Sequence, residues 1–492
     1  MTATMTPSFV LPSAVTFSER LRPHRSQVLV GLALGLSAER LLDGTPFGLG
    51  HALFAVLAAG LVAHHAGREA WTQAGAHRWV LGASVLLLGS TMLHTSTWLA
   101  VMSTVASVLL FALAVQGWTG ERPLSGLRTG QLLGAPFKTV GQAVHAGAVV
   151  TSRELEAANV NQVVSAYGPG ALRLVAIVVP PVLLLTVLLS SGDAVFRARL
   201  EALERALFGV PLEGFVRGGF VTLVSGLVLT GVLAMASRRR DGVSPSAPRR
   251  ALKGFESFVL LGTLTTLLLA FGVSATPCAL APAACELPEG VTYADAAHEG
   301  FFQLLFAAVA ILGLLMGLPA RTQLSSKRAE LTFTALSTAL VLATMPMVVS
   351  GVARLWRYET TYGLTVLRLL AYAGLGLVSA VLVWRALTLW TMQGSFVGGA
   401  LALFTVTMLG LAVLAPDAFI ARRNLAREEV DYAYLLSLSV DALPPMVEAG
   451  AKAEGLEWAL RGELQRVAPG DSLLTWNLGR SRARAALATL FP

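Results

Sequence analysis

The chain has 492 residues, of which 54% are apolar and only 13% are charged. Soluble proteins carry about twice that charged fraction, so the composition excludes a soluble multidomain protein as well as fibrous, disordered and nucleic-acid-binding classes. At roughly 20 apolar residues for each span, there is material for about ten or eleven membrane helices, and the net charge of +8 then reflects topology. The composition predicts an all-α, polytopic integral membrane helix bundle.

The first element is a polar tail, residues 1–26, which contains Arg20, Arg22 and Arg25. The first apolar run starts too late for a removed signal peptide and lacks a small-residue cleavage site. Eleven apolar runs follow, and each is interpreted as a membrane helix: 27–43, 47–67, 79–93, 96–117, 171–190, 213–236, 255–274, 299–319, 329–350, 363–387 and 396–415. The expected domains are a four-helix segment at 27–117 and a seven-helix membrane core at 171–415.

The positions of Lys and Arg predict the orientation. These residues are concentrated in the tail and in segments 64–78, 118–170, 237–253 and 320–328, whereas the alternate loops hold few. Because cytoplasmic loops carry the excess of Lys and Arg, the N-terminus is predicted to be cytoplasmic. Residues 118–170 are then expected to form cytoplasmic interfacial helices, and residues 194–209 a helix on the outer surface.

An odd number of spans places the C-terminal segment, residues 416–492, on the outer side of the membrane. Its sequence predicts short amphipathic helices, so we expect a small helical, extracytoplasmic domain. The segment is too long for its own charges to report its side, and one miscounted span would move it to the cytoplasm.

Both cysteines of the chain, Cys278 and Cys285, fall in one predicted outer loop. An oxidising compartment permits a disulfide between them. The polar, turn-rich flanking sequence favours such a pair over two buried thiols that merely pack.

Several signatures of known chemistry are missing from the sequence. It has no GxxxxGK[ST] phosphate loop, no GxSxG elbow and no HExxH, CxxC or EF-hand pattern. His64, His65 and His77 could bind a metal, but histidines in cytoplasmic loops are more often simply solvated. We therefore expect no catalytic residue, metal or cofactor. Gly31 and Gly35 form a GxxxG pair, which predicts close helix packing.

Charged side chains near membrane depth are costly and are often functional, and most of them lie at the predicted outer ends of the spans. A polar site that opens outward would explain this asymmetry. Arg354 could instead snorkel to lipid headgroups, whereas Arg368 lies deeper in its apolar run, which favours a polar interior for it. The candidate residues are Asp193, His298, Glu299, Arg354, Arg357, Glu359 and Arg368.

Other members of this candidate site also have structural interpretations. Asp193 could cap the outer-surface helix through a hydrogen bond to a backbone N–H. Arg357 and Glu359 could form an ordinary interfacial ion pair, which contributes little. His298 and Glu299 could transfer a proton, or could simply lie where a helix begins.

Seven segments together resemble the bacterial polytopic membrane proteins of the DUF4153/DUF4173 type, a domain of unknown function. They lie in order along roughly residues 171–480: LLSSGDAVF (188–196), FESFVLLG (255–262), YADAAHEGFFQL (293–304), RYETTYGLTVLRL (357–369), APDAFIARRNLA (415–426), DYAYLLSLSVDALPPM (431–446) and TWNLGR (475–480). Seven pieces in the right order make the resemblance fairly specific.

The resemblance implies an architecture and a location in the bacterial inner membrane, but no activity, because the family has none established. This chain has Glu299 where the family usually has Arg, and Ala415 where it commonly has Asn. The resemblance also adds Tyr362 to the candidate site. The motif residues that it singles out are Asp193, Tyr362, Thr365, Arg368, Asp417, Arg422, Asn424, Asp441 and Trp476.

Three functions are compatible with these observations. The leading hypothesis, which rests on the missing signatures, is a non-enzymatic envelope sensor, scaffold or assembly factor that binds a protein partner through its C-terminal domain. The alternative is an outer-leaflet enzyme acting on a lipid-linked or anionic substrate, with Arg354, Arg357 and Arg368 holding the anion and Asp193 or Glu299 as base. A transporter ranks third, since the charges cluster near one face. The expected partners are the lipid bilayer and an anionic lipid or lipid-linked ligand, and not nucleic acid.

Overall fold

The computed structural model describes residues 21, 25–42, 46–73, 75–118, 129–157, 213–237, 252–280, 305, 307–319, 321–391, 396–449, 460, 462–463, 467 and 471–490. Their regular structure is helical apart from two strands of two residues each, which confirms the predicted all-α class. The strands β1 (Leu252–Lys253) and β2 (Thr322–Gln323) pair in parallel.

Within the described residues, six helices are long and apolar enough to cross a membrane. Many of their large side chains face outward; Val273, Val406 and Val413 are 79%, 67% and 75% exposed. An apolar surface of this kind requires lipid around it, so the chain is a membrane protein. The six are α2 (Leu49–Gln73, apolar as far as Gly67), α4 (Thr97–Trp118), α9 (Gly254–Leu280), α11 (Lys327–Tyr362), α12 (Val366–Trp390) and α13 (Phe396–Leu414).

The count of eleven spans stays a prediction. Four further predicted runs contain α1 (Arg25–Leu42), α3 (Ala76–Ser90), α8 (Glu213–Ala236) and a short helix, Ala307–Gly317, none of which meets the same measure of a span. The run at 171–190 and the outer-surface helix at 194–209 lie outside the described residues. The described part of the interfacial segment 118–170 is one helix, α5 (Thr129–Ala157).

The chain forms two compact units. The smaller comprises Met1–Asp43, Gly60–Gln73 and Lys138–Asp241, and the larger comprises Gly44–Ala59, Ala74–Phe137 and Gly242–Pro492. The domain boundaries expected from the sequence stay predictions beside this division.

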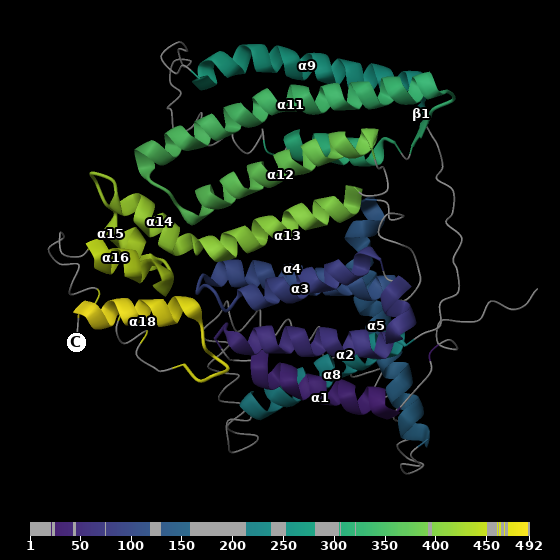
Figure 1. The fold of residues 1–492 in the computed structure, drawn as a ribbon, viewed down its shortest axis with the longest axis vertical. Helices are drawn as coiled ribbons and strands as arrows, with labels where there is room; N and C mark the ends of the chain where they lie inside the picture. The colour runs from purple at the N-terminus through teal and green to yellow at the C-terminus, as the bar shows by residue number, and fades with distance from the viewer. Residues whose placement is uncertain are drawn as a thin grey trace, which may run out of the picture. The chain divides into compact units, whose positions relative to one another are not determined.

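In the larger unit the helices pack in an order that differs from their order along the chain. α9 packs on α11, α11 on α12, α12 on α13, α13 on α3, and α3 on α4 (Figure 1). Leu261, Leu340 and Leu382 lie in the core shared by α9, α11 and α12. The contact of α13 with α3 therefore brings the α3–α4 hairpin beside helices that follow it by hundreds of residues.

Short helices gather at one end of these spans (Figure 1). α14 follows α13 directly, because Ala415 adopts a left-handed φ of 49° and Pro416 begins the new helix. α14 contacts α12 and α13, while α16 and α18 pack on each other and on the turn η4. These helices are α14 (Pro416–Leu425), α15 (Tyr432–Ser437), η4 (Val440–Ala442), α16 (Leu443–Ala449) and α18 (Leu478–Leu490).

Glycines set the packing of the smaller unit. α1 lies so close to α8 at Gly31 and Gly35 that a Cβ at either position would overlap atoms of α8. Gly231 of α8 and Gly147 of α5 make an equally close contact between those two helices. The close packing predicted from the GxxxG pair is confirmed.

Candidate functional site

The connection between α3 and α4, residues 91–96, lies against three segments of the C-terminal region, all within the larger unit. These are the start of α14, the turn η4 and the segment that leads into α18. Together they enclose a set of polar side chains that we term the buried polar cluster. Its members are His94, Thr95, Ser96, Asp417, Ser439, Asp441 and Asn477.

Asp417 lies in the first turn of α14, where the helix dipole favours a carboxylate. The side chain is 2% exposed, and its Oδ2 accepts hydrogen bonds from Ser96 Oγ at 2.5 Å and from Ser439 N at 3.2 Å. Its Oδ1 is buried without a hydrogen-bond partner among the described residues. One carboxylate thus ties α14 both to the α3–α4 connection and to the residue before η4.

Asp441, in η4, exchanges hydrogen bonds with Thr95. Its Oδ2 accepts from Thr95 N at 2.6 Å, and its own N–H donates to Thr95 Oγ1 at 3.2 Å. Gly479 lies against the carboxylate, where any Cβ would overlap Oδ1. Burial raises the pKa of Asp441 to about 6; the charge of Asp417 adds to this, and hydrogen bonds from Thr95 and Ser96 oppose it.

His94 is fully enclosed, and among the described residues neither ring nitrogen has a hydrogen-bond partner of normal geometry. Burial lowers the pKa of His94 to about 4, although Asp417 and the backbone of Ser96 act in the opposite direction. At neutral pH the cluster therefore holds a neutral imidazole near two carboxyl groups. One of these, Asp441, exchanges its proton near pH 6.

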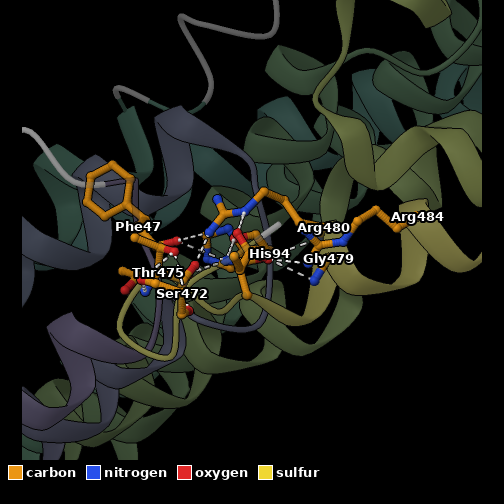
Figure 2. Close-up of polar contacts among 10 residues, drawn as sticks. Phe47, His94, Ser472, Thr475, Gly479, Arg480 and Arg484 are labelled. Carbon is orange, nitrogen blue, oxygen red and sulfur yellow. Dashed lines mark hydrogen bonds and ion pairs between the residues drawn. The ribbon is translucent and has the colours of Figure 1, made fainter. Parts of the chain in front are cut away.

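Asn477 joins three backbone segments through one amide group. Its Nδ2 donates to the carbonyl oxygens of Phe47, Thr91 and His94 at 3.2, 3.0 and 2.9 Å, and its Oδ1 accepts from Gly479 N at 2.9 Å (Figure 2). The amide therefore caps the start of α18 and at the same time fixes the residues before α2 and α4. The side chain is fully buried.

An arginine on α18 extends this network outward. Arg480 donates to the carbonyl oxygens of Phe47 and Thr475, and its Nε pairs with Asp471 Oδ1 at 2.8 Å (Figure 2). The other oxygen of Asp471 pairs with Arg484. Backbone hydrogen bonds from the first residues of α2 to the carbonyl oxygens of residues 474 and 476 complete the junction.

The α11–α12 turn is fastened to α14 in a similar way. Gly363 has a φ of 78°, which ends α11, and the side chain of Thr365 caps α12. The amide of Asn424 exchanges two hydrogen bonds with the backbone of Leu364, at 2.7 and 2.8 Å. Arg427 donates to three carbonyl oxygens in the last turn of α11, those of residues 359, 360 and 361.

Three residues of the sequence-predicted polar site meet at this turn: Glu359, Tyr362 and Arg368. Glu359 is 8% exposed, accepts a hydrogen bond from Tyr372 Oη at 2.9 Å and pairs with Arg423 at 3.1 Å. Arg368 donates to the carbonyl oxygens of Tyr362 and Gly363. The guanidinium of Arg368 also stacks over the ring of Tyr358, 4.3 Å from its centroid.

The described structure places the remaining predicted residues only in part. Arg354 and Arg357 lie on α11, and each takes part in an interaction. Cys278 belongs to α9, but only its backbone is described, so the disulfide stays a prediction. The residues that lie outside the described ranges are Asp193, Cys285, His298 and Glu299.

Sequence reasoning singled out only two of the seven residues of the buried polar cluster. The family-like segments singled out Asp417 and Asp441, but nothing in the sequence connects them with His94 or Ser96, more than 300 residues earlier. The only local signal was the polar stretch TMLHTST at 91–97 between two apolar runs, which is typical of a turn. The cluster also gives no metal site by the usual requirement: among the described residues, no three His, Cys, Asp or Glu side chains gather closely enough to hold an ion.

The chain also matches the model of a protein family. A model with the description "Domain of unknown function (DUF4153)" matches residues 81–449, well over half of the chain. The match starts before the range of 171–480 expected from the sequence pieces, so it includes the α3–α4 connection, and it ends before TWNLGR. No curated protein and no solved structure matches the chain.

Proposed function

Given that the chain belongs to the DUF4153 family, we propose that it is a non-enzymatic scaffold or assembly factor of the bacterial envelope. Its C-terminal helices form the surface that binds a protein partner, and the membrane helices hold that surface at a fixed place on the bilayer. One observation carries the proposal: polar side chains at this end of the spans are used for hydrogen bonds that join the C-terminal region to the ends of the spans.

The binding groups that an enzyme would need are already engaged in this way. Glu359 is paired and buried, and Nη1 of Arg368 is used to cap the end of α11, so an anionic substrate would have to compete with these contacts. The cluster residues Asp417 and Asp441 are 2% and 4% exposed, which leaves no route for a substrate to reach them in this conformation. Side chains used in this way hold segments together, as a scaffold requires.

The proposal places the C-terminal helices on the outer side of the inner membrane. They contact the connections at 91–96 and 363–365, and the distribution of Lys and Arg assigns both connections to the outer side. The N-terminus is then cytoplasmic. The partner surface is formed by exposed side chains of both charges in this region, among them Arg422, Glu428, Glu429 and Arg482.

An outer-leaflet enzyme is the second candidate, and one observation favours it. Oδ1 of Asp417 and both ring nitrogens of His94 lack partners among the described residues, and a carboxylate with a neutral imidazole is a common acid–base pair. The candidate requires the cluster to open to a lipid-linked or anionic substrate. A transporter stays third, because the cluster lies at the ends of the spans and not at mid-depth.

Complementation of a deletion strain separates the first two candidates. We expect Asp417→Asn and His94→Gln, which remove proton transfer but keep size, to restore the deletion phenotype at normal protein abundance. We expect Arg482→Glu, on the exposed face of α18, to lose rescue at the same abundance. The opposite pattern, in which Asp417→Asn or His94→Gln fails although the protein accumulates and Arg482→Glu rescues, would establish the enzyme and refute the scaffold.

A further inference from the structure

Arg385 is a buried cation within a membrane helix. It lies in α12, five residues before the last residue, Trp390, and is only 7% exposed. Its surroundings are apolar: Leu315 and Leu382 are buried beside it, and its guanidinium lies over the ring of Phe396, 5.1 Å from the centroid. A charge at such a place is costly unless an opposite charge compensates it.

Within the described part of the chain no carboxylate forms an ion pair with Arg385. Its one hydrogen bond there runs from Nε to the carbonyl oxygen of Leu315, at 3.1 Å. This carbonyl belongs to the last turn of the helix Ala307–Gly317, so the contact is a helix C-cap. The cap accounts for one of five N–H donors and leaves the positive charge without an anion.

The two Nη atoms are the free end of the guanidinium. Neither Nη atom makes a hydrogen bond to a described residue. Neither is among the buried side-chain atoms that lack a partner, so both can be reached from the surface. A planar fork of N–H donors that an outside group can reach is the geometry that binds a phosphate through two parallel hydrogen bonds.

The position along α12 fits a phosphate of the membrane. Five residues of helix correspond to about 8 Å, which places Arg385 close to headgroup depth. Leu252, Leu318 and Leu324 pack in one core with Ala386, so the segments around them lie at the same end of the bundle as Arg385. These segments carry exposed basic side chains. Those basic residues are Lys253, Arg321, Lys327 and Arg328; the exposed carboxylates of Glu256 and Glu330 lie beside them and leave a net positive charge, which attracts anionic lipid.

We propose that Arg385 forms a binding site for a phosphate group, supplied by the headgroup of an anionic phospholipid. The lipid completes the junction of the helix Ala307–Gly317, α12 and α13. Trp384 fixes the wall of the site by donating from Nε1 to the carbonyl oxygen of Phe396, at 3.1 Å. The site lies at the opposite end of α12 from the buried polar cluster and does not depend on the proposed scaffold function.

Native mass spectrometry of the purified full-length chain tests this site. After incubation with phosphatidylglycerol and removal of excess lipid, wild type should retain a bound phosphatidylglycerol, and Arg385→Gln should retain about tenfold less, as expected for the loss of charge-assisted hydrogen bonds. Arg482→Gln removes the same charge from an exposed position at the opposite end of the bundle and should retain as much as wild type. Equal retention by wild type and Arg385→Gln would overturn the proposal.

A second measurement keeps the proposal testable if Arg385→Gln does not fold. The melting temperature of wild type should rise with phosphatidylglycerol and not with phosphatidylcholine of the same chain length. Stabilisation to the same extent by both lipids would refute an anion site. Stabilisation by inorganic phosphate alone, with no lipid retained, would identify a soluble anion as the ligand and refute the headgroup as its source.

Discussion

At the residue scale, two shifted pKa values of the buried polar cluster act on stability in opposite directions. The pKa of Asp441 is about 6 against 3.8 for a free carboxyl, so between these values the folded chain holds a proton that the unfolded chain has released, and stability rises as pH falls. The pKa of His94 is about 4 against 6.5, so over nearly the same interval the unfolded chain binds a proton that the folded chain excludes, and stability falls as pH falls.

We therefore expect single substitutions to reveal pH dependences that offset each other in wild type. As the pH is lowered from about 6 to about 4, the melting temperature of Asp441→Asn should fall, because the His94 effect alone remains. For His94→Gln it should rise, with a slope of up to roughly 1.4 kcal/mol per pH unit for one proton. Glu448→Gln, at an exposed carboxylate, serves as control. Parallel pH profiles for all four proteins would contradict these assignments.

Asn477 should be among the most sensitive positions of the C-terminal region. Asn477→Leu removes the donor for three carbonyl oxygens and the cap of α18, and we expect a loss of about 2–3 kcal/mol of unfolding free energy or more, since each buried group left unpaired costs roughly 1–3 kcal/mol. Ser472→Ala, in the exposed turn of the same segment, should change stability by less than about 0.5 kcal/mol. Thermal unfolding in detergent measures both, and equal effects would argue against the Asn477 network.

Ala415 adopts a backbone conformation that alanine rarely takes. Its φ of 49° is unfavourable for alanine, whereas Asn, the residue that the family resemblance leads us to expect at this position, tolerates the left-handed region. We expect Ala415→Asn to raise the melting temperature, corresponding to about 0.5–1 kcal/mol, and Ala426→Asn, at a φ of −83°, to give no gain. A loss of stability in Ala415→Asn would show that the α13–α14 junction adopts another conformation.

At the element scale, the close packing of α8 against α1 and α5 depends on glycine. A Cβ at Gly231 would overlap the carbonyl oxygen of Ala143, so Gly231→Ala should separate the helices and destabilise the smaller unit by about 1–3 kcal/mol. Gly219→Ala adds the same methyl group to the same helix, where no atom of the described residues lies within 4 Å, and should be neutral or stabilising. Proteolysis of α5 and α8 would report the difference, and similar resistance in both variants would refute this packing.

The elements that hydropathy predicts well are those that lipid surrounds. The runs at 96–117 and 396–415 agree closely with α4 and α13. The run at 329–350 ends too early, because α11 continues through its charged segment to Tyr362 and stops only at Gly363. Hydropathy marks the part of a helix that lies in lipid, whereas a helix ends where its backbone geometry changes.

At the scale of the whole molecule, the sequence could not predict which turns meet. Asp417 and Asp441 were recognisable from the family-like segments, but their partners Thr95 and Ser96 belong to a hairpin that reaches them only because α3 packs on α13. Helix order in a bundle depends on side-chain packing between surfaces that are all apolar. The polar contacts that result are visible only once that order is known.

The junction of the C-terminal helices with the α3–α4 connection is the central claim, and a cysteine pair tests it most directly. Thr95 Oγ1 lies 3.1 Å from Ser439 Oγ, so Thr95→Cys with Ser439→Cys, in a chain carrying Cys278→Ser and Cys285→Ser, should cross-link under mild oxidation in intact membranes. Thr95→Cys with Thr391→Cys, at the opposite end of α12, should not. No cross-link between positions 95 and 439, or equal cross-linking of both pairs, would contradict the account.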